Sequence, residues 1–593
     1  MTDQNNRRDF LIKAASTASV AALGGTLAAC GGGDVSPSQF KFGVASGDPL
    51  GDRVILWTHA KIEGSEASVE LIWQMATDAG FNSIVQSGRI EAVADTGFTA
   101  KVDAAGLGAG TAYWYRFIDG AGIVSPTGTT RTLPAAGVAS VKFAVFSCSL
   151  YSEGYFNTYN AAAASDAQFA VHLGDYIYEY GSDPRKFGNA DAVTLGRVTS
   201  SVNDIVSLAD YRGRYALYRS DPNLQALHAR MPWITVWDDH EFTNNAWVGG
   251  AENHNTQAQG DWTTRKNVAA RVYHEWMPIR RQDTTNLLKI YRSFDFGNLL
   301  SLHMLDTRIE GRDQQYDNFG DADGGIGRYV AGFTPGAGGV PPDAARRMIS
   351  TTQQAWLAAG ITSSRAAWQF LGNQDIMARM WIPASVLQAQ AAVPPNPAAV
   401  QAAVGNYLGA KATRAAAGAA ALTPTQAALL NTAMNPRLPY NLDAWDGYPS
   451  QREAVLQAVR AQGKRLVALS GDSHNAWFTH LTTLAGVKVG VEFAGSSVTA
   501  PGFESAGLGG LAGSLDGSAL VPQLGNAAIG AGLGLIDDLN YADTSRRGYL
   551  LMTVTADAVR GEYVFVSTVK STTYTATVGR TITVAASGAV TYG

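Results

Sequence analysis

The sequence predicts an α/β protein in two parts, a small all-β module followed by a larger layered α/β body. Three observations lead to this prediction. The chain has 593 residues, which is more than one ordinary domain holds. Between residues 40 and 135, short runs alternate apolar and polar side chains and are separated by turns, which is the pattern of half-buried strands. Beyond residue 135, continuous apolar runs alternate with helical stretches, as in a layered α/β domain.

The composition excludes several classes of protein. Apolar residues make up 46% of the chain, which is enough for a large core. Charged residues make up only 16% and there are 64 glycines, so a loop-rich globular protein is favoured over a coiled coil or a charged disordered chain. The net charge of −5, without any block of basic residues, predicts no nucleic-acid-binding surface. Two cysteines are too few for a disulfide framework.

The N-terminus has the pattern of a twin-arginine export signal. Arg7 and Arg8 precede a hydrophobic anchor, and residues 14–29 carry no charge. This stretch is too short, and too rich in Gly, Ser and Thr, for a stable membrane span. We therefore expect a signal peptide at 1–30 and a linker at 31–39, with the twin-arginine export machinery as a partner and a periplasmic or cell-envelope location.

The end of this signal resembles a lipobox. Residues 27–30 read Leu-Ala-Ala-Cys, and in a lipobox the cysteine becomes the lipidated first residue; ordinary cleavage after small residues is the alternative. Nothing later in the chain offers about 18 consecutive apolar residues, so we expect membrane attachment only through a lipid anchor at Cys30. Cys148 would then be alone in an oxidising compartment, where a buried inert thiol or a thiolate held on a metal would survive.

The N-terminal module is predicted from three strand-like runs. Residues 53–57, 69–73 and 113–117 alternate in the manner of strands and are bounded by Gly and Asp turns. Their regular spacing predicts a sandwich of the fibronectin or immunoglobulin type over residues 40–135. We find no chemically suggestive cluster in it and expect it to serve for packing.

The body is predicted over residues 136–593. Its apolar runs predict buried strands at 141–147, 168–173, 233–237, 299–305, 367–371 and 466–469. Helices are expected between them, at 155–164, 353–363 and 451–461. Two inserts are expected to be peripheral, an Ala-, Gln- and Pro-rich segment at 383–440 that should be helical and a Gly-rich segment at 500–535. The runs at 549–554 and 561–566 alternate like edge strands that close a sheet.

Side chains able to bind metals follow four of the predicted strands. In chain order they are Cys148, then Asp175 and Tyr178, then Asp239 and His240, then Asp472 and His474. Taken singly, each is more typical of a turn, a helix cap or a satisfied core residue. Because the carboxyl ends of strands meet at one edge of an open α/β sheet, their joint occurrence predicts a two-metal hydrolytic centre bridged by a carboxylate.

Six short motifs along the chain carry a resemblance to a known family. They are at 42–49 (Phe-Gly-Val-Ala-Ser-Gly-Asp-Pro), 146–149 (Phe-Ser-Cys-Ser), 174–179 (Gly-Asp-Tyr-Ile-Tyr-Glu), 237–241 (Trp-Asp-Asp-His-Glu), 305–308 (Leu-Asp-Thr-Arg) and 471–474 (Gly-Asp-Ser-His). Together they resemble the PhoD-like alkaline phosphatases, a branch of the calcineurin-like metallophosphoesterases, from about residue 40 to the C-terminus outside the two inserts. The resemblance implies a four-layer body of two mixed β-sheets flanked by helices, behind the N-terminal sandwich.

The resemblance also implies an iron(III) and calcium centre. Iron(III) would be held by Cys148, Asp175, Tyr178 and His474. Thiolate and phenolate both stabilise the oxidised metal, and a phenol three residues after the aspartate can turn to the same ion. Asp175 would bridge to calcium held by the hard oxygens of Asp239 and Asp472. Asn245 and Asn373 are candidate further calcium ligands, with loop capping as the alternative, and a second calcium is implied without assigned ligands.

The implied reaction is hydrolysis of phosphate mono- and diesters by a metal-bound hydroxide. We assign His240, Asp239 and Arg308 as catalytic. His240, beside Asp239, would protonate the leaving alkoxide or bind a phosphoryl oxygen. Arg308 would clamp phosphate or form a structural ion pair, for example with Asp306. The expected partners are small phosphate esters or phospholipid headgroups.

Three other functions match parts of the sequence. A phosphodiesterase or phospholipase D-type hydrolase would use the same site on another ester. Gly471-Asp472-Ser473 resembles the nucleophile block of a serine hydrolase, but such blocks open the catalytic domain and have an Asp-x-x-His partner near its end, whereas this block comes last and no such partner follows. A non-enzymatic surface lipoprotein would bind a partner through its sandwich, and metal analysis would distinguish it from an enzyme.

Overall fold

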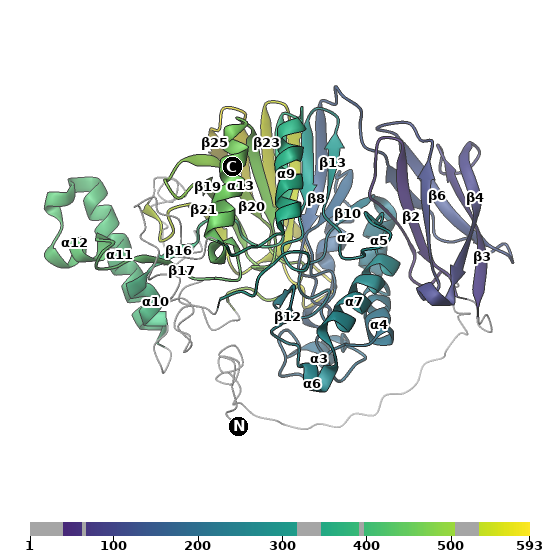
Figure 1. The fold of residues 1–593 in the computed structure, drawn as a ribbon, viewed down its shortest axis with the longest axis horizontal. Helices are drawn as coiled ribbons and strands as arrows, with labels where there is room; N and C mark the ends of the chain where they lie inside the picture. Colours follow the sequence, from purple (N-terminus) through teal and green to yellow (C-terminus); the bar gives the residue numbers. More distant parts are fainter. Residues whose placement is uncertain (1–39, 62–66, 317–344, 391–395, 505–532) are drawn as a thin grey trace.

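The computed structural model describes residues 40–61, 67–316, 345–390, 396–504 and 533–593 (Figure 1). The expected signal peptide, linker and lipobox with Cys30 lie outside the described residues, as does most of the Gly-rich insert. Two large β-sheets with helices beside them form the body, and smaller sheets lie at its sides.

The larger sheet has ten strands, and its centre carries three of the predicted strand ends. Its order is β25 (Val590–Tyr592), β24 (Ala576–Ala585), β23 (Ala558–Val566), β22 (Arg547–Thr555), β8 (Ser140–Phe146), β9 (Phe169–His172), β10 (Trp233–Thr235), β1 (Val44–Gly47), β2 (Arg53–His59) and β5 (Thr99–Ala105). The central pairs β8–β9, β9–β10 and β10–β1 are parallel, and the remaining pairs are antiparallel. The carboxyl ends of β8, β9 and β10 therefore meet at one edge of the sheet.

The second sheet has seven strands and supplies the fourth strand end. Its order is β13 (Arg292–Phe296), β14 (Leu300–Met304), β15 (Trp368–Gly372), β18 (Arg465–Ser470), β20 (Lys488–Ala494), β19 (Ala476–Thr482) and β21 (Leu539–Asp543). The strands β14, β15, β18 and β20 are mutually parallel, and β13, β19 and β21 pair antiparallel to their neighbours. Both sheets are thus mixed, as expected.

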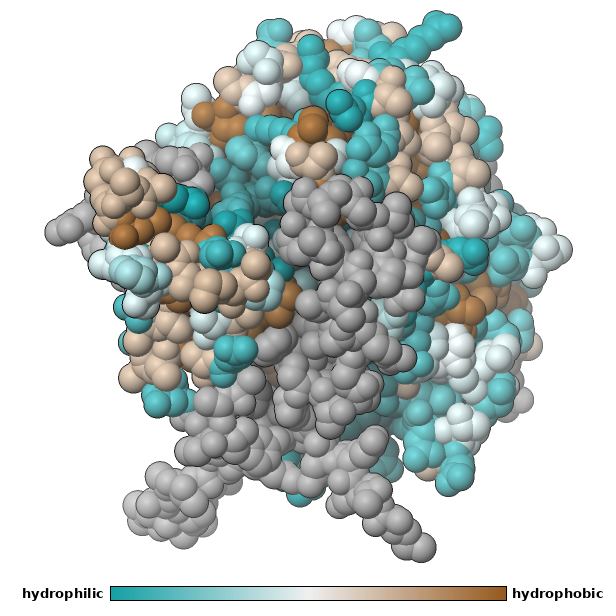
Figure 2. All heavy atoms as spheres, turned by 60° about the vertical axis from the view of Figure 1, so that its left-hand side comes forward, coloured by the Kyte–Doolittle hydropathy of each residue, from teal (hydrophilic) through white to brown (hydrophobic). Residues whose placement is uncertain are grey.

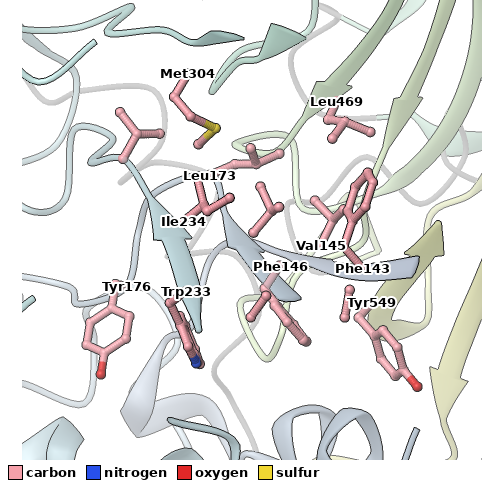
Figure 3. Close-up of a cluster of buried hydrophobic side chains, with 14 of the residues drawn as sticks. Phe143, Val145, Phe146, Leu173, Tyr176, Trp233, Ile234, Met304, Leu469 and Tyr549 are labelled. Carbon is pink, nitrogen blue, oxygen red and sulfur yellow. The ribbon is translucent and has the colours of Figure 1, made fainter. Parts of the chain in front are cut away.

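A shared hydrophobic core joins the two sheets. In Figure 3, the side chains of Phe143 and Val145 lie on the face of β8 that is turned toward Leu469 of β18, and all three belong to one hydrophobic cluster. The ring of Phe143 meets that of Phe370 on β15 edge to face, with centroids 5.9 Å apart. Because these side chains interdigitate between the sheets, the strand ends of one sheet are held at a fixed position relative to those of the other.

Helices cover the outer faces of the two sheets (Figure 1). On the larger sheet, α2 (Asn157–Ala163) packs against β22, α5 (Pro222–Arg230) packs against β1, and α4 (Leu208–Arg219) packs against α7 (Trp262–Trp276). On the other, α13 (Pro449–Ala461) packs against β20 and α9 (Thr351–Ser363). Local sequence fixes their starts, since α4 begins at a Ser207/Asp210 capping box and α5 begins with a proline after the Asp221 cap. This confirms the α/β fold with two mixed sheets flanked by helices.

The N-terminal module shares a sheet with the body. Its second sheet has the order β4 (Ile84–Val93), β3 (Ser68–Ala76), β6 (Ala112–Asp119) and β7 (Gly128–Arg131). This sheet packs over β1, β2 and β5 around its own apolar cluster. However, β1 continues into the larger sheet, with Gly47 opposite Trp233. Only glycine fits at position 47, because a Cβ there would lie 2.4 Å from the carbonyl oxygen of Pro278.

The C-terminal strands are not edges, contrary to the expectation. β22 pairs with β8 and β23 lies between β22 and β24, so both are interior strands of the larger sheet. Their alternating sequence reports which face is buried, but the neighbours of a strand are set by pairing with distant residues.

The insert at 383–440 is largely helical and projects from the body as an arm (Figure 1). It contains α10 (Ala384–Gln390), α11 (Pro397–Ala417) and α12 (Pro424–Leu430). Figure 2 turns this side of the molecule forward and shows hydrophilic and hydrophobic residues interspersed on it. Among the described residues, no helix is both long and apolar enough to cross a membrane.

Candidate metal centre

The loops that follow β8, β9, β10 and β18 converge, and their donor atoms form overlapping groups. In each group the donor atoms lie within 4.8 Å of one another; three of these groups are Cys148 with Asp175 and His474, Asp175 with Asp239 and His240, and Asp238 with Asp239 and Asp472. Asp175 belongs to two groups, and so does Asp239. The side chains that the sequence places at four separate strand ends therefore form one continuous centre, with Asp175 at its middle.

The backbone of this centre is held in an uncommon conformation. Five of its residues have a positive φ: Cys148 at 61°, Asp175 at 56°, Asn245 at 52°, Asp472 at 54° and His474 at 60°. Only three other non-glycine residues in the described parts of the chain, Asp48, Phe81 and Phe98, share this feature. Left-handed backbone costs free energy for residues with a Cβ, and its concentration at one place is typical of a functional site.

The first corner of the centre combines a thiol, a phenol and an imidazole. The Tyr178 hydroxyl donates to Oδ2 of Asp175 at 3.0 Å and lies 3.1 Å from Nε2 of His474. Nδ1 of His474 lies 2.7 Å from the carbonyl oxygen of Pro501. Because a carbonyl oxygen only accepts, Nδ1 carries the proton and Nε2 presents a lone pair to the centre, which is the arrangement of a metal-binding histidine.

These buried groups fit a cation chemically. Burial, and then the neighbouring Asp175 carboxylate, raise the pKa of the Cys148 thiol well above its usual value, and the same two causes raise the pKa of Tyr178. Burial and the charge of Asp239 likewise raise the pKa of Asp175. A cation bound among them would reverse these shifts by favouring the charged forms. The donor set of sulfur, phenol oxygen, imidazole nitrogen and carboxylate suits a transition metal.

The second corner consists of carboxylates. Oδ2 of Asp239 accepts a hydrogen bond from the Asn245 backbone at 2.5 Å. Burial raises the pKa of Asp472 to about 7, and neighbouring carboxylates add to this effect. Oδ2 of Asp238 is buried without a hydrogen-bond partner. A group of hard carboxylate oxygen donors suits calcium.

His240 is oriented by Glu179, which the sequence analysis did not single out. Nδ1 of His240 lies 2.6 Å from Oε2 of Glu179, and the other Glu179 oxygen accepts from Thr243 Oγ1 at 3.0 Å and Asn244 N at 2.9 Å. Burial acts to raise the pKa of Glu179, but the His240 ring lowers it below its usual value. The ring packs on Tyr178 with centroids 4.1 Å apart. His240 also belongs to a donor group with Asp175 and Asp239.

Arg308 is a buried counter-ion to five carboxylates. Its side chain is 0% exposed and contacts Asp238 at 2.5 Å, Asp443 and Asp472 at 2.8 Å, Asp375 at 3.1 Å and Asp239 at 3.9 Å. Asp306 meets Arg308 only at its backbone amide, which donates to Oδ1 of Asp306 at 2.9 Å; the backbone amide of Ile309 donates to the same oxygen at 2.8 Å. Of the two expected roles, the structure therefore favours the structural ion pair, but with carboxylates from other loops.

The two asparagine candidates differ in position. Asn245 lies at the centre, where its backbone amide contacts Asp239 and its side chain is held by Glu252. Asn373 lies in the core behind it, where its side chain donates to Ser470 Oγ at 3.1 Å and accepts from the Trp445 indole at 2.9 Å. Asn373 therefore fits the loop-capping alternative.

Ser473 has no geometry that favours a nucleophile. Its hydroxyl accepts a hydrogen bond from the Trp477 indole at 2.9 Å. An indole N–H only donates and cannot take a proton from serine. The serine-hydrolase interpretation of residues 471–473 is therefore unsupported.

Comparisons with known proteins agree with this geometry. The model of the PhoD-like phosphatase family matches residues 143–563, and that of the PhoD-like phosphatase N-terminal domain matches residues 27–134. Alkaline phosphatase D of Bacillus subtilis (strain 168) is 33% identical over 526 residues, covering 84% of this chain and 77% of that protein. A solved structure of PhoD matches with a TM-score of 0.71 at 28% identity, covering 95% of this chain and 93% of that one.

Proposed function

The chain belongs to the PhoD-like phosphatase family and is a phosphoesterase hydrolase; on this premise we propose that it is an exported enzyme that hydrolyses phosphate monoesters and diesters at an iron–calcium centre. One observation carries the proposal. The donor atoms of Cys148, Asp175 and His474 lie within 4.8 Å of one another, and Asp175 also belongs to a group with Asp239. One carboxylate thus lies between a sulfur-containing corner and an all-oxygen corner.

The donor chemistry supports this choice of ions. Cys148, Tyr178, His474 and one oxygen of Asp175 suit iron(III), and Asp239 and Asp472, with Asn245 beside them, suit calcium. When bound, these cations would lower the pKa of water and neutralise the charge that develops on the phosphoryl group.

The chain's own residues would supply the remaining chemistry. His240, oriented through Nδ1 by Glu179, would hold a proton at Nε2 and donate it to the leaving alkoxide. The negative charge of Glu179 favours the protonated ring. The buried Arg308 guanidinium would keep Asp239 and Asp472 in place between turnovers.

We propose export through the twin-arginine route to the periplasm or cell envelope, on the basis of the Arg7–Arg8 signal. Folding before export allows metals to be loaded in the cytoplasm. A lipid anchor at Cys30 would hold the mature protein at the membrane. Mass spectrometry of protein purified from the exporting cell tests both points, since a mature chain that retains residues 1–30 would contradict them.

The function is tested by metal analysis combined with spectroscopy. We expect protein exported by its own route to contain iron and calcium and to absorb visible light through charge transfer from Tyr178 to iron(III). Tyr178→Phe should shift or remove this band, whereas Tyr155→Phe should not, because the Tyr155 hydroxyl donates to the carbonyl oxygen of Leu195. A colourless and fully active enzyme would contradict the iron assignment.

The substrate and the stereochemistry are tested separately. Turnover of matched mono- and diester substrates decides between a phosphatase and a phosphodiesterase or phospholipase D-type enzyme. Direct attack of water on phosphorus predicts inversion of configuration, and retention would exclude this route.

A further inference from the structure

Glu241 is a buried carboxylate between the loops that follow β9 and β10. Its side chain is 0% exposed. Oε2 accepts hydrogen bonds from the backbone amides of Asp175 at 3.0 Å and Asp238 at 2.7 Å. Oε1 accepts from the backbone amide of Tyr176 at 2.6 Å. One side chain thus binds three amides that belong to two loops.

The backbone of these loops leaves no simpler partner for the amides. Asp175 has a φ of 56°, outside the strand conformation that would continue the β9 ladder. At Gly174, an added Cβ would lie 2.4 Å from the backbone nitrogen of Asp238. The two loops therefore approach backbone to backbone, and their buried N–H groups need an acceptor that reaches between them. A carboxylate does this with charge-assisted bonds.

We propose that Glu241 is a positioning residue that fixes the Asp175 loop against the Asp238–His240 loop and so sets the spacing of the two metal groups. The two loops also contact each other directly, because the His240 backbone amide donates a hydrogen bond to Oδ1 of Asp175 at 3.3 Å. Because Asp175 belongs to both groups, movement of its loop would loosen both ions. The inference rests on the proposed function, because this spacing matters only if the centre binds cations.

The first test is metal loss from the holoenzyme under a chelator. Glu241→Gln keeps the volume of the side chain but turns one acceptor into a donor that faces an N–H group. We expect metal affinity to fall about 10- to 100-fold, the range seen when residues that orient metal ligands are changed, and metal to dissociate correspondingly faster. We also expect kcat to fall while KM stays within about twofold, since Glu241 touches no substrate position.

The matched control is Asp446→Asn. Asp446 is also buried and accepts from the Met380 backbone at 2.8 Å and the Trp381 indole at 3.1 Å, and it belongs to none of the metal groups. Both variants should unfold at a lower denaturant concentration, but only Glu241→Gln should lose metal faster. Metal loss within twofold of the wild type in Glu241→Gln, or equal acceleration in both variants, would overturn the proposal.

A measurement on the wild-type chain keeps the proposal testable if Glu241→Gln does not fold. We expect the amides of Asp175, Tyr176 and Asp238 to exchange hydrogen as slowly as those of β9, both with metal and after chelation. If these amides exchanged hydrogen at the rate of an open loop after chelation, the proposed positioning role of Glu241 would be refuted. A failure of the proposed function can be distinguished from a failure of this inference, because in the former case the wild-type protein itself would contain no bound metal.

Discussion

Replacement of Arg308 by methionine removes the cation from a cluster of buried and partly exposed carboxylates while keeping most of the side-chain volume. Arg308 is fully buried, with Asp238 at 2.5 Å and Asp472 at 2.8 Å. Arg312 lies 3.5 Å from Asp375 and also contacts Asp443, so those two carboxylates keep a positive partner. The substitution therefore leaves Asp238 and Asp472 without one.

The size of the effect follows from this arrangement. Breaking a buried ion pair on one side costs about 3–5 kcal/mol, because the remaining charge stays buried and unpaired. We expect a loss of this size at about pH 8 in protein freed of metal. Burial already raises the pKa of Asp472 to about 7, and removal of Arg308 raises it further. A carboxyl with a raised folded-state pKa costs stability as it ionises, so the deficit should shrink as the pH falls through the variant's higher pKa and level off below about 7, where Asp472 is protonated in both proteins.

Urea unfolding with a chelator present measures this deficit. Arg185→Met is the control, because Arg185 pairs with Asp183 at 2.6 Å but is 87% exposed, and such pairs contribute little. We expect the Arg308→Met midpoint to fall well below the wild-type midpoint at about pH 8 and to approach it at about pH 5.5. Equal midpoints at the higher pH, or a gap that stays constant as the pH falls, would refute the reasoning.

Three further predictions follow from buried contacts. Glu179→Gln should lower kcat by about 10-fold or more for alkyl esters and much less for nitrophenyl esters, because His240 protonates only poor leaving groups; steady-state kinetics that show equal losses would exclude the proton-donor role. Asp48→Asn should destabilise the fold by about 3–5 kcal/mol, since Asp48 and Arg292 form a buried pair at 2.6 Å; an unchanged urea midpoint would contradict this. Burial lowers the pKa of His59 to about 4, so the wild type should lose on the order of 3 kcal/mol between about pH 6.5 and pH 4 as the unfolded chain takes up a proton; His59→Phe should flatten this part of the profile, and an unchanged slope would show that another group is responsible.

Much of the fold could be predicted because buried strands carry a local signal. The run at 141–147 overlaps β8 and the run at 466–469 lies in β18, since a short continuous apolar run is typical of a strand covered on both faces. The meeting of Cys148, Asp175 and His474 followed from this, because parallel strands place their carboxyl ends together.

The rest of the site depends on contacts that leave no local pattern. Glu179 and Glu241 lie inside motifs that were recognised, yet their roles depend on which amides face them across the fold. Asp375 and Asp443 meet Arg308 from loops that carry no motif, so the counter-ion cluster was missed. Likewise, the sequence of β22 shows its buried face but not that β8 is its neighbour.

The pairing of β22 with β8 constrains when the protein can fold during synthesis. Leu550 lies opposite Val145, so β8 exposes an unsatisfied edge until nearly the whole polypeptide has left the ribosome. Closure of so distant a contact is slow, and the open intermediate is prone to aggregate or to pair with another nascent chain. Truncation near the C-terminus should therefore yield insoluble material instead of a shortened, active protein, and chaperones that hold the unfinished chain should raise its yield.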